Sequence, residues 1–285
     1  MSMRDRPRLG RGLKDVSRYF LADSHPRGGP DPVPTSEDAR PISVFVFHAS
    51  SPEVQSLLTL ALAMETARLG RGALIWDGMA QGAQGVKRLA GGLLARPGGR
   101  DKGGGCCIRL YGLGAIPIHD AACPVWSQAE ASCLDLPGDG DTARGELLVF
   151  VNASPDMGFF TRGDLPDHTV IAARTDERSL LKAYACMRVM DRRAPGSRMY
   201  LVLEAHGGEP ANQCDRTFEK LASFARENSK AAIAYLGCLI ADDETARSIH
   251  EADPLALMMS QSPAGASLRG VCSRFLDLVL AGETP

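Results

Sequence analysis

The chain has 285 residues, of which 44% are apolar and 23% charged, so it is long enough to bury one large core with a short appendage. Its 32 Lys and Arg nearly balance its 34 Asp and Glu, which excludes an overall charge that favours nucleic acid or lipid headgroups. No run approaches the roughly 18 apolar residues of a membrane span, and the N-terminus lacks a signal peptide's apolar segment, so we expect a cytoplasmic protein.

Residues 1–41 are expected to form an appendage outside the core. Residues 1–12 hold four Arg and one Asp and are locally basic. Apolar spacings of three and four then predict a short amphipathic helix from Gly12 to Leu21, followed by a Pro-rich linker. This helix either docks a partner protein or folds back onto its own domain. Its expected partner-binding residues are Leu13, Val16, Tyr19 and Phe20.

From residue 42 to 285, apolar runs alternate with helical patterns, which predicts an α/β domain with a doubly wound, mostly parallel sheet. Two Gly-rich stretches, 91–105 and 137–145, are expected to be surface loops. The expected strands are Ile42–Phe47, Ala73–Trp76, Ile108–Tyr111, Leu147–Val151, Thr169–Ala173, Met199–Leu203 and Ala234–Leu239. The expected helices are Pro52–Leu69, Arg178–Asp191, Gln213–Asn228, Thr245–Glu251 and Ala266–Ala281.

Eight cysteines are spread along the chain, and none has the C-x-x-C spacing of a zinc site. Most are therefore expected to be thiols, and no metal site is predicted. Cys186 and Cys238 lie in apolar runs and are expected to be small core residues.

The residues that follow the first expected strand stand where an open parallel sheet normally holds a phosphate. They read HASSPEVQS from His48 to Ser56, and the next helix and strand read LLTLALAMETARLGRGALIWD. This segment resembles the MinD/ParA/FlhG family of P-loop ATPases, in which a deviant Walker loop K-G-G-x-G-K-T leads into an apolar helix, a Leu-Gly turn and a strand ending in Asp. Segments 168–190 and 218–255 also resemble the family, in the same order, over about the last 240 residues.

The resemblance implies the P-loop NTPase fold and a vestigial nucleotide site of five residues. Gln55 stands at the family's phosphate-contacting lysine, Ser56 at its magnesium-binding threonine and Ser50 at its second, signature lysine. Asp77 matches the first carboxylate of a D-x-D segment, and Asn152 replaces the Asp after a later strand. The resemblance assigns no catalytic residue that is still intact.

Several departures from the family pattern weaken such a site. Pro52 has no N–H for a phosphate nest, Val54 has a branched Cβ where glycine would allow close approach, and Glu53 adds negative charge. The two lost lysines remove charge-assisted bonds worth roughly 1.5 to 3 kcal/mol each. We therefore expect no tight binding of ATP and no cofactor. Ser56 and Asp77 also have simple structural roles, in a helix first turn and a strand-end turn.

The resemblance implies a MinD/FlhG-like pseudo-ATPase, a regulator or scaffold that places or controls a cell-envelope or polar machinery, such as a flagellum or secretion system, through protein contacts. A homodimer, or a heterodimer with an intact family member, is implied because the family works as dimers. The alternative is an active ATP hydrolase with an unusual loop, in which Arg174, Arg178 or a dimer partner supplies the missing charge. Neither nucleic acid nor a transmembrane segment is expected.

Overall fold

The computed structural model describes residues 42–79, 85–95, 106–108, 116–120, 147–154, 166–206, 211–228 and 232–280. The predicted tail, helix and linker of residues 1–41 lie outside them, as does the Gly-rich stretch 137–145. The division into residues 1–41 and 42–285 therefore stays a prediction.

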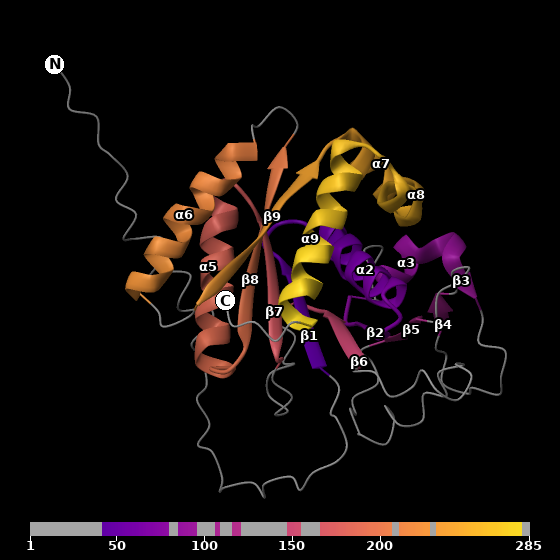
Figure 1. Cartoon of the computed structure of the whole chain (residues 1–285), viewed down its shortest axis with the longest axis horizontal. Coiled ribbons are helices and arrows are strands. Elements are labelled where there is room, and N and C mark those ends of the chain that lie inside the picture. The colour runs from indigo at the N-terminus through magenta and orange to yellow at the C-terminus, as the bar shows by residue number, and fades with distance from the viewer. Residues whose placement is uncertain are drawn as a thin grey trace, which may run out of the picture. The chain divides into compact units, whose positions relative to one another are not determined.

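One sheet runs through the described part of the chain, with the strand order β3-β4-β5-β2-β6-β1-β7-β8-β9 (Figure 1). From β5 to β9 in this order all neighbours pair in parallel, whereas β3, β4 and β5 pair antiparallel. The strands are β1 (Ile42–His48), β2 (Gly72–Asp77), β3 (Leu94–Ala95), β4 (Cys106–Ile108), β5 (Ile116–Asp120), β6 (Leu147–Asn152), β7 (His168–Arg174), β8 (Arg198–His206) and β9 (Ile233–Ala241).

Helices cover both faces of this sheet, which confirms the predicted doubly wound α/β fold (Figure 1). Helices α5 and α6 pack on one face, and α2 and α9 pack on the other together with the short helices α3, α7 and α8. The helices are α2 (Pro52–Arg68), α3 (Val86–Ala90), the 3-10 turn η1 (Gly91–Leu93), α5 (Glu177–Arg193), α6 (Ala211–Asn228), α7 (Asp243–Glu251), α8 (Pro254–Met259) and α9 (Pro263–Leu280).

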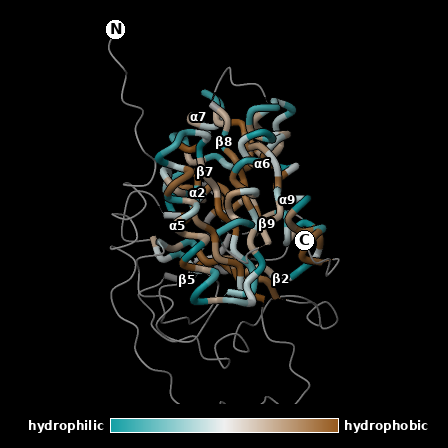
Figure 2. The backbone as a smooth tube through the Cα atoms, turned by 90° about the vertical axis from the view of Figure 1, so that its left-hand side faces the viewer, coloured by the Kyte–Doolittle hydropathy of each residue, from teal (hydrophilic) through white to brown (hydrophobic). Residues whose placement is uncertain are grey.

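Two apolar clusters form the core, one on each face of the sheet. Helix α2 lies inside the first, and every residue from Val54 to Ala67 is buried. Apolar residues occur around the whole helix, because β1, β2 and β6 contact one side and α9, α3 and α8 cover others. Hydrophobic segments accordingly run through the middle of the fold in Figure 2. A rigid, buried α2 fixes the turn that precedes it.

The long elements predicted from the sequence are confirmed within a few residues at their ends. Of the strand expected at Ile108–Tyr111 only Ile108 is described, and it is the last residue of β4, which pairs antiparallel with β5. Strand β5 was not predicted. The loop expected from Gly91 begins instead with η1 and β3. Helices α3 and α8 were missed because each is shorter than two turns and shows no full period.

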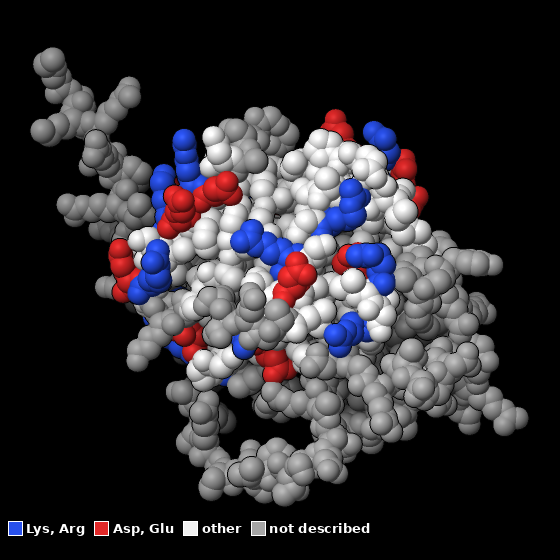
Figure 3. All heavy atoms as spheres, viewed as in Figure 1, with Lys and Arg blue, Asp and Glu red and all other residues white. Residues whose placement is uncertain are grey.

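Charged side chains of both signs are interspersed among the described residues on the face shown in Figure 3. No helix in the described ranges is both long and apolar enough to cross a bilayer. The mixture of both signs in Figure 3 agrees with the balanced composition.

Candidate functional site

The turn between β1 and α2 is only three residues long. Strand β1 ends at His48 and α2 begins at Pro52, with Ser51 as the N-cap in extended conformation. The Ser51 Oγ accepts the Val54 N–H at 3.2 Å, and Pro52 takes the first helical position, where a missing N–H costs nothing. Residues 52–56 therefore already belong to α2, although the family pattern places them in the phosphate loop.

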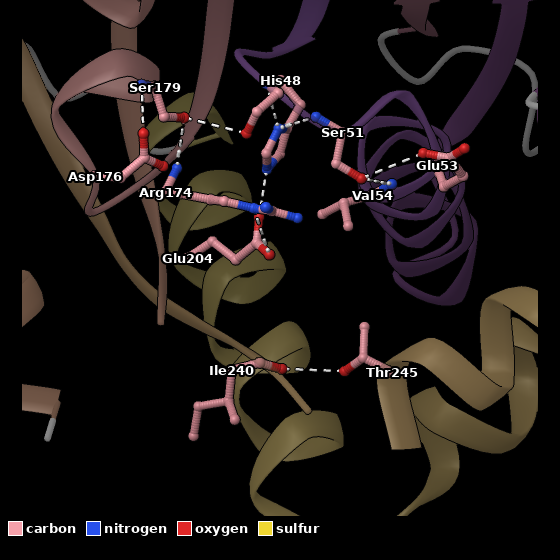
Figure 4. A network of polar contacts seen from close by, with 11 residues as sticks. His48, Ser51, Glu53, Val54, Arg174, Asp176, Ser179, Glu204, Ile240 and Thr245 are labelled. Carbon is pink, nitrogen blue, oxygen red and sulfur yellow. Dashed lines mark hydrogen bonds and ion pairs between the residues drawn. The ribbon is translucent and has the colours of Figure 1, made fainter. Parts of the chain in front are cut away.

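His48 fills the inside of this turn with its imidazole ring (Figure 4). Its Nδ1 accepts the backbone N–H groups of Ser50 at 3.1 Å and Ser51 at 2.9 Å. An Nδ1 that accepts two N–H groups carries no proton, so the ring proton lies on Nε2. That Nε2 donates to the Glu204 Oε2 at 2.7 Å, and both side chains are buried. The imidazole therefore satisfies the N–H groups that a bound anion would need.

Glu204 also pairs with Arg174, at the end of strand β7. The Arg174 Nε lies 3.5 Å from the Glu204 Oε1 as an ion pair without hydrogen-bond geometry. The two residues face each other in the parallel register of β7 and β8, so the backbone sets this pairing. The Arg174 N–H donates to the Ser179 Oγ at 2.9 Å, and the Ser50 Oγ lies 3.2 Å from the same oxygen. Ser50 thus contacts the start of α5.

A second buried network connects α2 with the carboxyl ends of β6 and β2. The Gln55 Oε1 accepts the His48 N–H at 3.0 Å, and its Nε2 donates to the Asn152 Oδ1 at 3.0 Å and the Ala153 carbonyl at 3.2 Å. The Asn152 Nδ2 donates to the Ser56 Oγ at 3.1 Å and the Asp77 Oδ1 at 2.8 Å. Both amide side chains therefore use their oxygen and both N–H groups inside the protein.

Asp77, at the end of β2, is the last member of this network. It is fully buried, and it accepts the Met79 N–H at 3.2 Å and the Val86 N–H at 2.8 Å, which ties the end of β2 to the start of α3. Burial raises the pKa of Asp77, while the hydrogen bonds from Asn152 and from the backbone act in the opposite direction. A carboxylate with this many donors serves as a structural acceptor.

The fold matches known proteins, although no protein-family model and no curated protein matches the sequence. MinD from Aquifex aeolicus superposes with a TM-score of 0.56 at 11% identity over 86% of this chain and 98% of that chain. A chain of the A. aeolicus MinC:MinD cell division protein complex gives 0.55 at 14% over 86% and 97%. A ParA family ATPase from Chlorobium tepidum gives 0.50 at 8% over 84% and 99%. This chain has the MinD/ParA P-loop NTPase fold.

In this MinD/ParA-fold chain, four of the five predicted site residues meet in one buried network, namely Gln55, Ser56, Asp77 and Asn152. Ser50 lies on the same turn but points to Ser179. The His48–Glu204 pair was not predicted, because the two residues are 156 positions apart. No metal-binding cluster of His, Cys, Asp and Glu occurs among the described residues. Leu13, Val16, Tyr19 and Phe20 lie outside them.

Proposed function

We propose that this MinD/ParA-fold chain is a pseudo-ATPase, a regulator or scaffold that acts through protein contacts and binds no nucleotide tightly. The observation that carries the proposal is the occupied turn: the N–H groups of Ser50 and Ser51 already bond to the His48 imidazole. In a P-loop such N–H groups point at the phosphates. Here an anion must first displace a buried side chain that is itself held by Glu204.

The charges around the turn also oppose a triphosphate. Glu204 and Asp77 are buried nearby, and Glu53 lies in the first turn of α2. Gln55, at the family's lysine position, has no positive charge, and its amide is hydrogen-bonded to His48, Asn152 and Ala153. Freeing these buried groups without new partners costs about 1 to 3 kcal/mol each. An incoming nucleotide would thus break existing bonds and bring its negative charge close to these carboxylates.

The rival activity needs a cation that can reach a phosphate. Arg174 is paired with Glu204, which also bonds to His48 of the turn. Arg178 is exposed on the first turn of α5. The Arg174 side chain is 39% exposed, so in an active ATPase it would have to serve a phosphate and the buried Glu204 carboxylate at the same time. The geometry therefore favours the pseudo-ATPase.

Calorimetry of the full chain with ATP and Mg²⁺ tests this proposal. We expect no saturable heat up to millimolar nucleotide and no steady phosphate release, because the N–H groups of Ser50 and Ser51 are bonded to His48 and Arg174 is paired with Glu204. An intact MinD-type ATPase in the same buffer is the positive control. Micromolar binding with phosphate release, lost in Arg174→Ala, would instead establish the rival activity.

The protein contacts are assigned to the predicted N-terminal helix. Phe20→Asp should abolish capture of the partner by the tagged full chain, as should deletion of residues 1–40, because the charge falls on the expected apolar face. Lys14→Ala, on the opposite side of the same helical wheel, is the matched control and should retain capture. Unchanged capture by Phe20→Asp would contradict this part of the proposal. Recovery of a ParA-type protein with intact lysines would identify the heterodimer.

A further inference from the structure

Two cysteines from different elements meet on the face of the sheet that α5 and α6 cover. The Sγ atoms of Cys214 in α6 and Cys238 in β9 lie 3.0 Å apart, and both residues are thiols. A disulfide bond is about 2.05 Å long, so the sulfur atoms are only about 1 Å from bonding distance. Cys214 is fully buried, whereas Cys238 is partly accessible on β9, the edge strand of the sheet.

A β-bulge turns Cys238 toward Cys214. Along β9, Ile233 and Tyr235 face the α5/α6 side, and strict alternation would send residue 238 to the opposite side. The register shifts where Tyr235 pairs with Leu201 and Gly237 with Val202, so Leu236 is the extra residue. Gly237 has φ +126°, a conformation that side-chain-bearing residues rarely adopt. Beyond the bulge, Cys238 joins Cys214 in the same apolar cluster.

We propose that Cys214 and Cys238 form a reversible disulfide that joins α6 to the edge strand β9, with a peroxide as oxidant and a dithiol as reductant. Cytosolic disulfides of this kind are usually redox-sensing. The inference is independent of the nucleotide proposal, because neither cysteine belongs to the networks around the turn.

Because Cys238 is the more exposed thiol, it reacts with the peroxide first, and the buried Cys214 reacts second. The Cys238 thiolate attacks the peroxide; an S–O bond forms, the O–O bond breaks, and hydroxide leaves and takes up a proton as water. Cys214 then attacks the Cys238 sulfur of the resulting sulfenic acid; the S–S bond forms, the S–O bond breaks, and a second water leaves. In sum, two thiols and one hydrogen peroxide give one disulfide and two waters.

An aromatic pair lies beside the two thiols on the same elements. Phe218 of α6 stacks on Tyr235 of β9 with ring centroids 4.6 Å apart and an interplanar angle of 15°. Burial raises the pKa of Tyr235, so its phenol stays protonated and adds no negative charge beside a thiolate. We expect this stacking to fix the position of α6 on β9 and so to keep the two sulfur atoms close together.

Mass spectrometry of the full chain tests this disulfide directly. Trypsin releases peptides 199–216 and 231–247, each with one cysteine. After hydrogen peroxide and iodoacetamide, we expect these two peptides to be linked, and dithiothreitol should separate them. The oxidised chain should also melt several degrees higher, by about 5 °C, because the bond closes a loop in the unfolded state.

Three single variants separate this pairing from general oxidation. Cys214→Ala should leave a sulfenic acid on Cys238 that dimedone traps, and Cys238→Ala should leave Cys214 unmodified at the same peroxide dose. Cys272→Ala, which changes a buried thiol elsewhere in the core, should keep the linked peptides. The proposal is overturned if both cysteines still carry iodoacetamide while other thiols are oxidised, or if either links to a different cysteine. Melting in dithiothreitol checks that each variant folds.

Discussion

Asn152→Asp is expected to lower the free energy of unfolding at pH 7 by about 3 to 5 kcal/mol, because it places a second carboxylate inside a closed network. The Asn152 Nδ2 donates to the Asp77 Oδ1 at 2.8 Å. In the variant an oxygen takes the place of this donor, so two carboxylates meet at hydrogen-bond distance. Both residues are fully buried, so water screens the repulsion poorly.

The loss should depend on pH with a definite sign. Burial already raises the pKa of Asp77 above its ordinary value, and a neighbouring carboxylate raises the pKa of one member of the pair further. When the folded-state pKa is raised, the stability that the proton confers is present below the unfolded-state pKa and is lost as pH rises through the folded-state pKa. The gap between wild type and variant should therefore be small near pH 4 and largest above pH 7.

Urea unfolding across this pH range measures the effect. Asn212→Asp, on the exposed first turn of α6, makes the same chemical change away from the network and should be nearly neutral. Equal midpoints for the two variants would show that water or ions reach Asn152 freely. That outcome would remove the support that the closed network gives to the pseudo-ATPase proposal.

The sequence was sufficient for the fold because the long elements have strong local signals. Apolar runs bounded by turns marked β1, β6, β7 and β8, and a 3.6-residue period marked α5 and α6. Short elements carry no such signal: Pro117 in β5 argues against a strand, yet β5 lies near the sheet's edge and pairs with β2. The bulge in β9 likewise depends on pairing with β8, which no local pattern reports.

Within the candidate site, only the contacts between residues at the ends of neighbouring strands could be predicted from the sequence. Strands β1, β6 and β2 end side by side, so the meeting of Gln55, Asn152 and Asp77 follows from the general rule about carboxyl ends of parallel strands. The His48–Glu204 bond reaches past β7 to β8, so it needs the full strand order and the side-chain rotamers. The sequence could show which phosphate-binding groups are missing, but not that an imidazole takes their place.

Because the imidazole of His168 is buried, the free energy of unfolding is expected to fall by about 3 kcal/mol between neutral pH and pH 4. His168 begins β7 and is 7% exposed, with its Nδ1 3.1 Å from the Tyr200 hydroxyl and its ring edge-on to Phe275. Burial lowers its pKa to about 4; Arg198 acts in the same direction, and Asp167 opposes both. Charging this ring in place would bury a cation out of reach of water.

The sign follows from proton binding by the two states. Between pH 6.5 and about 4 the unfolded chain binds a proton at His168 and the folded chain does not, so stability is complete above pH 6.5 and falls as pH decreases through this window. His168→Gln keeps a polar partner for the Tyr200 hydroxyl but cannot titrate, so its urea midpoint should fall less between pH 7 and pH 4.5. His250→Gln, exposed on α7, should follow the wild type. Parallel profiles for all three proteins would mean that His168 is protonated within the native fold, and the acid sensitivity would then belong to other groups.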